Sequence, residues 1–193
     1  MNIIKEYYEK KYRELCVLAD TEKCKTTLMR NNDTGQLVVN KIMNKTAFDV
    51  YEQLKPIKNK NLVKILDCYI DEDKCVEIEE FINGRRLDDY VTNQKLNYNQ
   101  CIKLTADICT ALEELHIIGI VHRDIQPKNI LISNEGTLKL IDFDISRKQH
   151  TGKSKDTELL GTAGYAAPEQ YGFSQTSEKS DIYSIGIVLK EMC

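Results

Sequence analysis

The stretch His122-Arg-Asp-Ile-Gln-Pro-Lys-Asn129, with Asp142-Phe-Asp144 after it, decides how this sequence folds. It follows an amphipathic helix and leads into two short apolar strands, and Asp142 comes directly after the second strand. Asp124, Asn129 and Asp142 therefore place three oxygen-bearing side chains in one loop and at a strand end. Any one of them alone is more typical of a turn cap or a surface charge. Their order and spacing together favour a cleft that binds a hard cation such as Mg²⁺.

The segments around this stretch have clear helical and strand patterns. Residues 99–116 carry apolar side chains on one face and predict an amphipathic helix. That face consists of Cys101, Leu104, Ile108, Ala111, Leu112 and Leu115. Residues 130–132 and 138–141 predict a pair of short strands. Residues 144–166 predict a long surface loop, and residues 181–190 a mostly apolar helix.

The first part of the chain has mostly strand patterns. The elements expected here are, in order, a short helix (1–15), a hairpin (28–30 with 36–41), a helix (47–57) and two strands (62–69 and 75–82). Pro56 is expected to interrupt the second helix, because proline cannot donate a backbone hydrogen bond.

Length, composition and charge narrow the class of protein. The chain has 193 residues, of which 41% are hydrophobic and 30% are charged, which excludes a collagen-like or largely disordered chain. Its net charge of −3 provides no basic field for binding nucleic acid. Seven cysteines without a Cys-x-x-Cys pair, and only three histidines, argue against a zinc site and favour reduced thiols in a cytoplasmic protein. The charged N-terminus is unlike a signal peptide, and no apolar run is long enough to span a membrane.

Several motifs resemble those of protein kinases, and they follow each other in the order typical of that family. His122-Arg-Asp124 with Asn129 resembles the catalytic loop, and Asp142-Phe143 resembles the start of the magnesium-binding motif. The other similar stretches are the strand with the phosphate-contacting lysine (38–41), the adenine-binding hinge (80–82), the end of an activation segment (161–169) and the start of the central helix of the second lobe (181–186). The resemblance covers roughly residues 14–193, and it is closest to bacterial relatives of the eukaryotic Ser/Thr kinases.

The resemblance implies an α+β, two-lobed protein-kinase-like fold. Residues 1–82 would form an antiparallel, β-rich N-lobe with one helix, and residues 83–193 a helical, incomplete C-lobe, with the nucleotide between the lobes. The chain stops at Cys193, inside the expected central helix. We therefore expect a shortened chain, a natural remnant or a homodimer that covers the apolar faces of this helix.

The resemblance also implies catalytic roles. Asp124 would orient the substrate hydroxyl and accept its proton, and Thr162 would contact Asp124. Gln126 stands where Ser/Thr kinases have a lysine, so Lys128 would supply the charge near the γ-phosphate, unless it is only a solvated loop residue. Asp181 would hold the catalytic loop from beneath, which is a structural role.

Binding of ATP and Mg²⁺ is implied for a second group of residues. Asn129 and Asp142 would hold Mg²⁺ against the phosphates, and Lys41 would contact the α- and β-phosphates. Glu52 is expected to pair with Lys41, with Asp49 as the neighbouring alternative. The remaining residues implied in nucleotide binding are Glu80, Ile82 and Leu131.

Some features depart from the family pattern. The segment Leu18–Leu28, where a phosphate-covering loop is expected, contains no glycine, so its backbone would approach phosphates less closely. Asp144 replaces a glycine beside the metal. The hydroxyls of residues 151–157 are the expected phosphorylation window of the activation segment.

Two functions follow as expectations. The first is a Ser/Thr protein kinase that uses ATP and Mg²⁺ to phosphorylate hydroxyls of a protein substrate. The alternative is a pseudokinase that binds a partner and transfers nothing, which the departures favour. A small-molecule phosphotransferase fits less well, because residues 161–169 resemble a segment that docks protein substrates.

Overall fold

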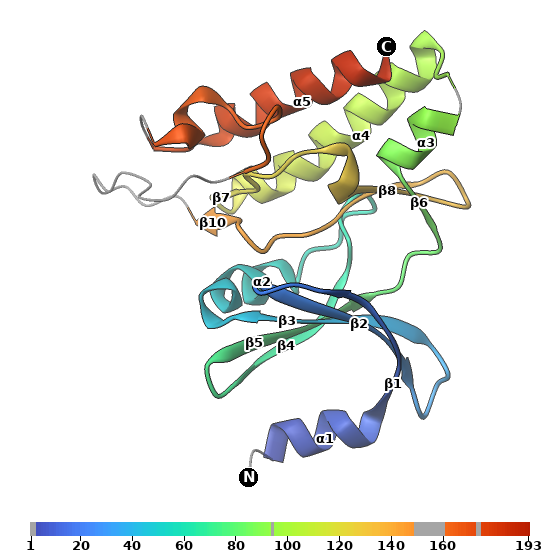
Figure 1. Ribbon diagram of the computed structural model, residues 1–193, viewed down its shortest axis with the longest axis vertical. Helices are drawn as coiled ribbons and strands as arrows, with labels where there is room; N and C mark the ends of the chain where they lie inside the picture. Colours follow the sequence, from blue (N-terminus) through green and yellow to red (C-terminus); the bar gives the residue numbers. More distant parts are fainter. Residues whose placement is uncertain (1–2, 94, 149–160, 173–174) are drawn as a thin grey trace. The chain divides into compact units, whose positions relative to one another are not determined.

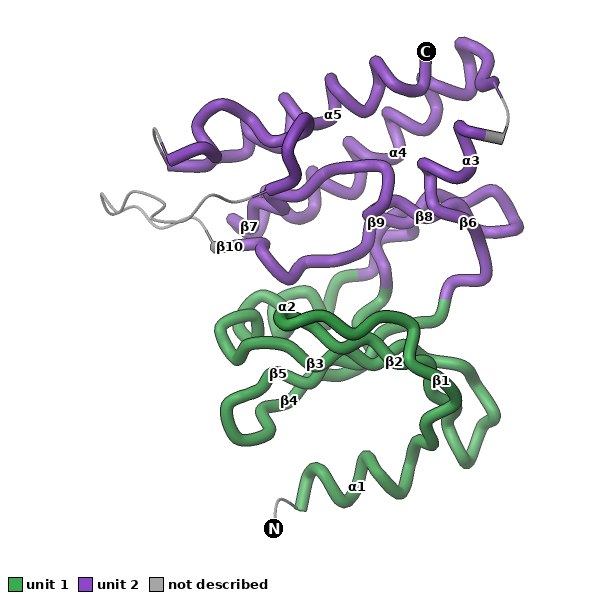
Figure 2. The backbone as a smooth tube through the Cα atoms, in the orientation of Figure 1, with its two compact units in different colours: residues 1–57, 64–81 green, residues 58–63, 82–193 purple. Residues whose placement is uncertain are grey.

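The computed structural model describes residues 3–93, 95–148, 161–172 and 175–193, and the chain divides into two compact units (Figure 2). Unit 1 comprises residues 1–57 and 64–81, and unit 2 comprises residues 58–63 and 82–193. The sequence assigned residues 58–63 to the first lobe, whereas the structure places them in unit 2.

Backbone pairing explains the place of residues 58–63. The N–H of Val63 donates to the carbonyl of Leu140 (3.0 Å), and the N–H of Leu140 donates to the carbonyl of Asn61 (2.8 Å). The Asn61 side chain, which is buried, donates from Nδ2 to the carbonyl of Leu138 (3.0 Å). These bonds add the segment to a strand of unit 2, a long-range pairing that no local sequence pattern indicates.

Unit 1 is built on a five-stranded antiparallel sheet (Figure 1). Its strands, in spatial order, are β1 (Tyr12–Asp20), β2 (Cys24–Asn31), β3 (Leu37–Asn44), β5 (Lys74–Glu80) and β4 (Ile65–Asp71). The predicted hairpin is the β2–β3 pair. Its turn is closed by the Asn31 carbonyl, which accepts from the N–H of Gly35 (2.9 Å) at a φ of 73° that suits glycine.

Helix α2 (Phe48–Leu54) follows a single 3-10 turn, η1 (Lys45–Ala47), and packs on the sheet. The Asn44 side chain caps this turn by accepting from the N–H of Thr46 (3.0 Å). The helix is shorter than the predicted 47–57, and it ends before Pro56, as expected for a residue without an N–H. Its buried residues are Val50, Tyr51 and Leu54.

Helix α1 (Ile3–Lys11) contacts strand β4. This strand is at one edge of the sheet, and β1 is at the other. The ring of Tyr8 stacks on Tyr69 with centroids 4.5 Å apart, and its hydroxyl donates to Asp67. Lys5 forms an ion pair with Asp71 (3.0 Å). Aromatic stacking and these polar contacts fix a helix that has no fully buried residue of its own.

Unit 2 combines helices with two small sheets. One sheet has the order β6 (Gly84–Arg86), β8 (Ile130–Ser133) and β9 (Leu138–Leu140), and the other pairs β7 (Ile120–Val121) with β10 (Arg147–Lys148). The helical elements are α3 (Leu87–Asn93), α4 (Tyr98–Ile117), η2 (Pro127–Asn129), η3 (Pro168–Tyr171) and α5 (Glu178–Met192). The predicted loop at 144–166 thus contains a short strand near its start, and residues 149–160 lie outside the described part of the chain.

Helix α4 confirms the sequence pattern. Its buried residues are the six apolar residues predicted for its inner face, and it begins with a capping box between Asn97 and Gln100. Helix α5 packs beside it (Figure 1), and the Cys101 thiol donates to the carbonyl of Met192 (3.3 Å). No helix in the described ranges combines the length and the apolar content needed to cross a membrane.

Candidate active site

The carboxylate of Asp124 is the centre of a hydrogen-bonded ring in unit 2. Thr162 Oγ1 donates to Asp124 Oδ1 (2.8 Å), and Gln126 Nε2 donates both to Asp124 Oδ2 (2.8 Å) and to Thr162 Oγ1 (2.7 Å). Asn129 Nδ2 donates to Asp124 Oδ2 (2.8 Å) and to the Asp124 carbonyl (2.9 Å). Three residues that the sequence singled out therefore donate to the carboxylate of a fourth, Asp124. The ring holds this carboxylate in a single orientation.

Asp181 holds the backbone of the same loop from the start of α5. It is fully buried and accepts from the N–H of His122 (3.0 Å) and from the N–H of Arg123 (2.8 Å). His116 Nε2, at the end of α4, lies 2.8 Å from Asp181 Oδ2. Because an ionised carboxylate only accepts, this nitrogen carries the proton. The structure thus gives Asp181 the contacts of a residue that supports the loop, and His116 is a third contact that sequence reasoning missed.

Arg123 has a left-handed backbone, with a φ of 72°, which is unfavourable for a residue with a side chain. Backbone hydrogen bonds support it there: its N–H donates to Asp181, and its carbonyl accepts from Gln170 Nε2 (2.7 Å). Asp142 is the second left-handed residue of the site, with a φ of 68°. Strained backbones of this kind concentrate at functional sites and need such support.

Glycine is required at position 161, where the φ is 94°. A Cβ there would lie 2.7 Å from Gln170 Nε2 and 3.0 Å from the carbonyl of Arg123, the two groups that bond to each other. The predicted activation-segment end at 161–169 is therefore fitted against the loop that contains Arg123 and Asp124, and Gln170 connects them. The expected phosphorylation window at 151–157 lies outside the described residues.

His122 is buried and neutral in this arrangement. Its Nε2 lies 3.2 Å from the carbonyl of Ile141, which can only accept, so Nε2 carries the proton. Its Nδ1 accepts from the N–H of Asp124 (3.3 Å). Burial lowers the pKa of His122, although the nearby carboxylates of Asp181, Asp124 and Asp142 raise it.

This lowered pKa predicts that folding loses stability in mild acid. Below the ordinary histidine pKa of about 6.5 the unfolded chain binds a proton that folded His122 does not, so the free energy of unfolding falls as the pH falls, by at most about 1.4 kcal/mol per pH unit. We expect wild type to lose more stability than His122→Asn between pH 7 and pH 5.5 in urea titrations. Equal losses in the two proteins would contradict the prediction.

Asn129 and Asp142 are the residues of this loop that could hold a cation. Asn129 is the last residue of η2 and Asp142 follows β9, and a bond from the N–H of Ile141 to the carbonyl of Asn129 (3.0 Å) joins the two segments. Both side-chain bonds of Asn129 use Nδ2, so its amide oxygen is the atom available to a cation. In the described ranges no three His, Cys, Asp or Glu side chains converge on one point. A carboxylate and an amide oxygen fit Mg²⁺, which usually takes a few protein ligands together with substrate phosphates and water.

Lys41 of unit 1 lies on β3, and the structure pairs it with Glu79 of β5 instead of Glu52. Lys41 Nζ lies 3.3 Å from Glu79 Oε1 and 3.4 Å from Oε2, and both side chains are buried. Glu52 lies 3.6 Å from Lys55 Nζ, and it accepts from the Cys68 thiol (3.7 Å). Burial and the Glu52 carboxylate raise the pKa of Cys68 to about 12. The expectation for Glu52 is therefore wrong, because its side chain lies against β4 and the end of α2.

The glycine-free segment Leu18–Leu28 consists of the end of β1, a tight turn at residues 21–23 and the start of β2. Thr21 Oγ1 donates to the carbonyl of Cys24 (2.9 Å) and accepts from the N–H of Cys24 (3.0 Å). The threonine hydroxyl closes the turn, so the hairpin does not need glycine to reverse the chain.

The other predicted site residues lie on β5, β8 and η2 and, for Ile82, between β5 and β6. Glu80 ends β5 in unit 1, and its Oε1 accepts from the N–H of Lys64 (2.9 Å). Ile82 begins the second part of unit 2, and Leu131 is a half-buried residue of β8. Lys128 is exposed on η2, between the buried residues Pro127 and Asn129.

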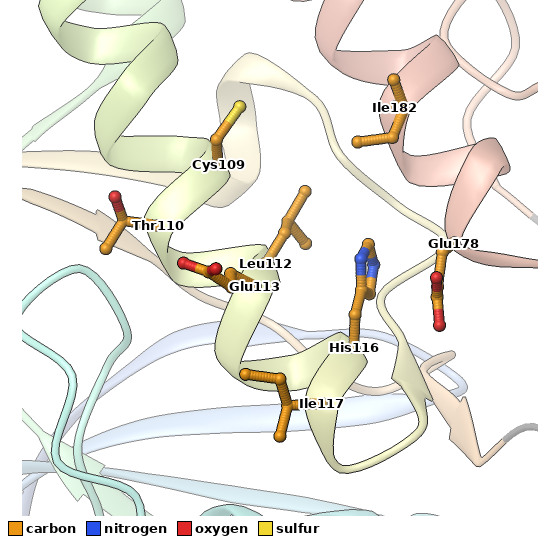
Figure 3. Close-up of a pocket in the computed structure, with 8 residues that line it drawn as sticks. All are labelled: Cys109, Thr110, Leu112, Glu113, His116, Ile117, Glu178 and Ile182. Carbon is orange, nitrogen blue, oxygen red and sulfur yellow. The ribbon is translucent and has the colours of Figure 1, made fainter.

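An open cavity of about 580 Å³ lies between α4 and α5 in unit 2 (Figure 3). It is lined by Cys109, Thr110, Leu112, Glu113, His116, Ile117, Glu178 and Ile182. None of the predicted site residues lines this cavity. Its connection to the site is His116, whose ring contacts Asp181 beneath the catalytic loop.

Comparisons with known proteins agree with these motifs. The chain matches the family model of the protein kinase domain over residues 21–193. It is 36% identical over 138 residues to a probable serine/threonine-protein kinase of Clostridium perfringens, which covers 70% of this chain and 20% of that protein. It is 32% identical over 167 residues to the probable serine/threonine-protein kinase PknB of Lactococcus lactis, covering 86% of this chain and 26% of the relative. It is 31% identical over 176 residues to the serine/threonine-protein kinase pakA of Talaromyces marneffei, covering 90% of this chain and 26% of that protein.

With most of its length matched to one domain model, the chain belongs to the protein kinase domain family. This match and the five-stranded antiparallel sheet confirm the predicted α+β, kinase-like fold. The chain spans about a fifth to a quarter of the length of these curated relatives. Helix α1 and strand β1 lie before the matched residues.

Proposed function

We propose that this chain transfers the γ-phosphate of ATP, with Mg²⁺, to Ser or Thr hydroxyls of protein substrates. The observation that carries the proposal is the ring around Asp124. In phosphoryl transfer the protein mainly positions the reactants and stabilises charge, and one residue orients the attacking hydroxyl. A carboxylate held by three donors is already oriented for that task.

The ring leaves Asp124 able to act as the base. Its two oxygens offer about four lone-pair positions, and the ring uses one on Oδ1 and two on Oδ2. The remaining position on Oδ1 would accept the proton of a substrate hydroxyl as its oxygen forms the bond to the γ-phosphorus and ADP leaves. Asp124 is only half-buried, which suits contact with a substrate.

Asn129, Asp142 and Lys41 would bind the nucleotide and its metal. Asn129 and Asp142 would supply oxygen ligands for Mg²⁺, which neutralises charge on the phosphates when bound. Lys41 would supply a positive charge to the α- and β-phosphates. Glu80, Ile82 and Leu131 are proposed to contact the adenine, and Lys128 the γ-phosphate.

A specific observation favours a second function, a pseudokinase that binds nucleotide or a partner without transfer. Gln126 donates to both Asp124 and Thr162 but carries no charge. If Lys128 does not supply the missing charge, the transferred phosphoryl group lacks one stabilising cation. Intact mass after incubation with Mg-ATP and a Ser/Thr-containing protein separates the two functions, because only a kinase adds phosphate.

Titration calorimetry with a non-hydrolysable ATP analogue tests the nucleotide site. We expect wild type to bind in a Mg²⁺-dependent manner, and Asp142→Asn to bind about tenfold or more weakly, because a neutral amide replaces the charged metal ligand. Asp107→Asn is the control, since Asp107 lies on α4 and pairs with Lys103 (2.7 Å). No binding by wild type at millimolar analogue would contradict the proposal for this chain.

A further inference from the structure

The partner of Lys41 comes from the same sheet. Strands β3 and β5 are antiparallel neighbours, and Lys41 lies opposite Glu77 while Val39 lies opposite Glu79. Residues opposite each other, and residues two apart on a strand, share one face of a sheet. Lys41, Glu77 and Glu79 therefore lie on one face, with Glu79 diagonal to Lys41. Strand pairing alone fixes the backbone positions of both members of the ion pair.

The contact between Lys41 and Glu79 is specific. Both carboxylate oxygens of Glu79 lie within 3.4 Å of Lys41 Nζ, and the two side chains are 6–7% exposed. Screening by water and salt is weak for a pair so deeply buried. A long lysine side chain has many rotamers, and a buried carboxylate beside its ammonium selects among them.

Helix α2 contributes a different surface to this unit. It has two acidic residues, of which Asp49 lies in its first turn. The other, Glu52, has a side chain that is 48% exposed and forms an ion pair with Lys55 in the turn that follows the helix. The residues that α2 buries are the uncharged Val50, Tyr51 and Leu54. The helix packs on the sheet through these side chains. The Lys41–Glu79 ion pair joins two strands of the sheet and uses no carboxylate of α2.

We propose that Glu79 is the positioning residue for Lys41, and that strand pairing sets the lysine for nucleotide binding independently of helix α2. This inference rests on the proposed function, in which Lys41 contacts the phosphates. A displacement of α2 would leave the Lys41–Glu79 pair in place. A regulatory movement of α2 would then have to act on a feature other than this ion pair.

A double-mutant cycle on nucleotide affinity tests the inference. The proteins are wild type, Glu79→Gln, Lys41→Met and the double variant, with Glu52→Gln as the matched control on α2. Affinity for the Mg²⁺ complex of a non-hydrolysable ATP analogue is measured by calorimetry, and circular dichroism verifies the fold of each protein. If Glu79→Gln does not fold, Glu79→Asp, which keeps the charge but withdraws it by one methylene, takes its place in the cycle.

We expect Glu79→Gln to weaken binding about tenfold, since a charge-assisted contact is lost. The affinity of Glu79→Asp for the analogue should fall several-fold, and that of Glu52→Gln should fall less than twofold. If Glu79 acts through Lys41, then replacing Glu79 should have no further effect once Lys41 is methionine. A structural role for Glu79 would instead give losses that add.

The outcomes separate this inference from the proposed function. Wild type that binds no nucleotide overturns the proposed function and the inference with it. Wild type that binds, with a large loss in Glu52→Gln or with additive losses in the cycle, overturns the inference alone.

Discussion

Asp124→Asn should lower the rate of phosphotransfer about 10²–10⁴-fold, the range typical of losing a general base. Asparagine has nearly the same shape as aspartate but cannot accept the proton of the attacking hydroxyl. The affinity for nucleotide should stay within about threefold of wild type, because Asp124 is not among the residues proposed to bind ATP or Mg²⁺.

The ring around Asp124 should survive this substitution. In wild type, Oδ2 accepts from Gln126 and Asn129, while Oδ1 accepts from Thr162. An asparagine can direct its oxygen to the two amide donors and its NH₂ to the Thr162 hydroxyl, which can also accept. The opposite orientation would place amide donors against each other. In the first orientation both amide donors keep an acceptor, and only the hydroxyl proton of the half-buried Thr162 needs a new one, which water can supply. The loss of rate would therefore reflect chemistry.

Transfer is measured by radiolabelled phosphate incorporated into a generic Ser/Thr-containing protein, at saturating Mg-ATP. Asp107→Asn, which removes the α4 carboxylate that pairs with Lys103, serves as the control and should retain the wild-type rate. A rate for Asp124→Asn above a tenth of the wild-type rate would exclude Asp124 as the base. Equal inactivity of wild type and both variants would favour the pseudokinase.

The parts of the fold that the sequence predicted are those that local pattern determines. The inner face of α4 followed from a helical period, and the β2–β3 hairpin followed from alternating strands around the turn at Asn31–Gly35. In unit 2 the residues around Asp124 were found because motif order and residue chemistry coincide there. The structure adds the contacts among them.

The features that the sequence did not predict depend on pairing between distant segments. Residues 58–63 join unit 2 through bonds to β9, and β10 pairs with β7 inside a segment expected to be a loop. Glu79 could have been found from strand alternation, because β3 and β5 place it on the same face as Lys41. The family pattern instead directed attention to Glu52 on the helix. A counting argument along one helix cannot detect a partner on a neighbouring strand.

Removing the Asp181 carboxylate should produce the largest loss of stability in unit 2. Asp181→Ala leaves the N–H groups of His122 and Arg123 and the ring of His116 without their acceptor, at a site with no exposure to solvent. Each orphaned buried donor costs about 1–3 kcal/mol, so we expect the free energy of unfolding to fall by about 3–5 kcal/mol. The left-handed backbone of Arg123 would also lose the hydrogen bond of its N–H to Asp181.

Asp181→Asn should be the milder variant and reveals which bonds matter. If the asparagine NH₂ faces Arg123, it meets one backbone N–H, and two donors are placed against each other. If it faces His122, it meets both the N–H of His122 and Nε2 of His116. The His116 ring could then move its proton to Nδ1 and accept at Nε2. One unsatisfied donor predicts a loss of about 1–3 kcal/mol, measured by urea unfolding followed by circular dichroism. The control is Asp124→Asn, which keeps an acceptor for both amide donors of the ring and whose stability should lie within about 1 kcal/mol of wild type. If the free energy of unfolding of Asp181→Ala lay within 1 kcal/mol of the wild-type value, the loop would not depend on this carboxylate.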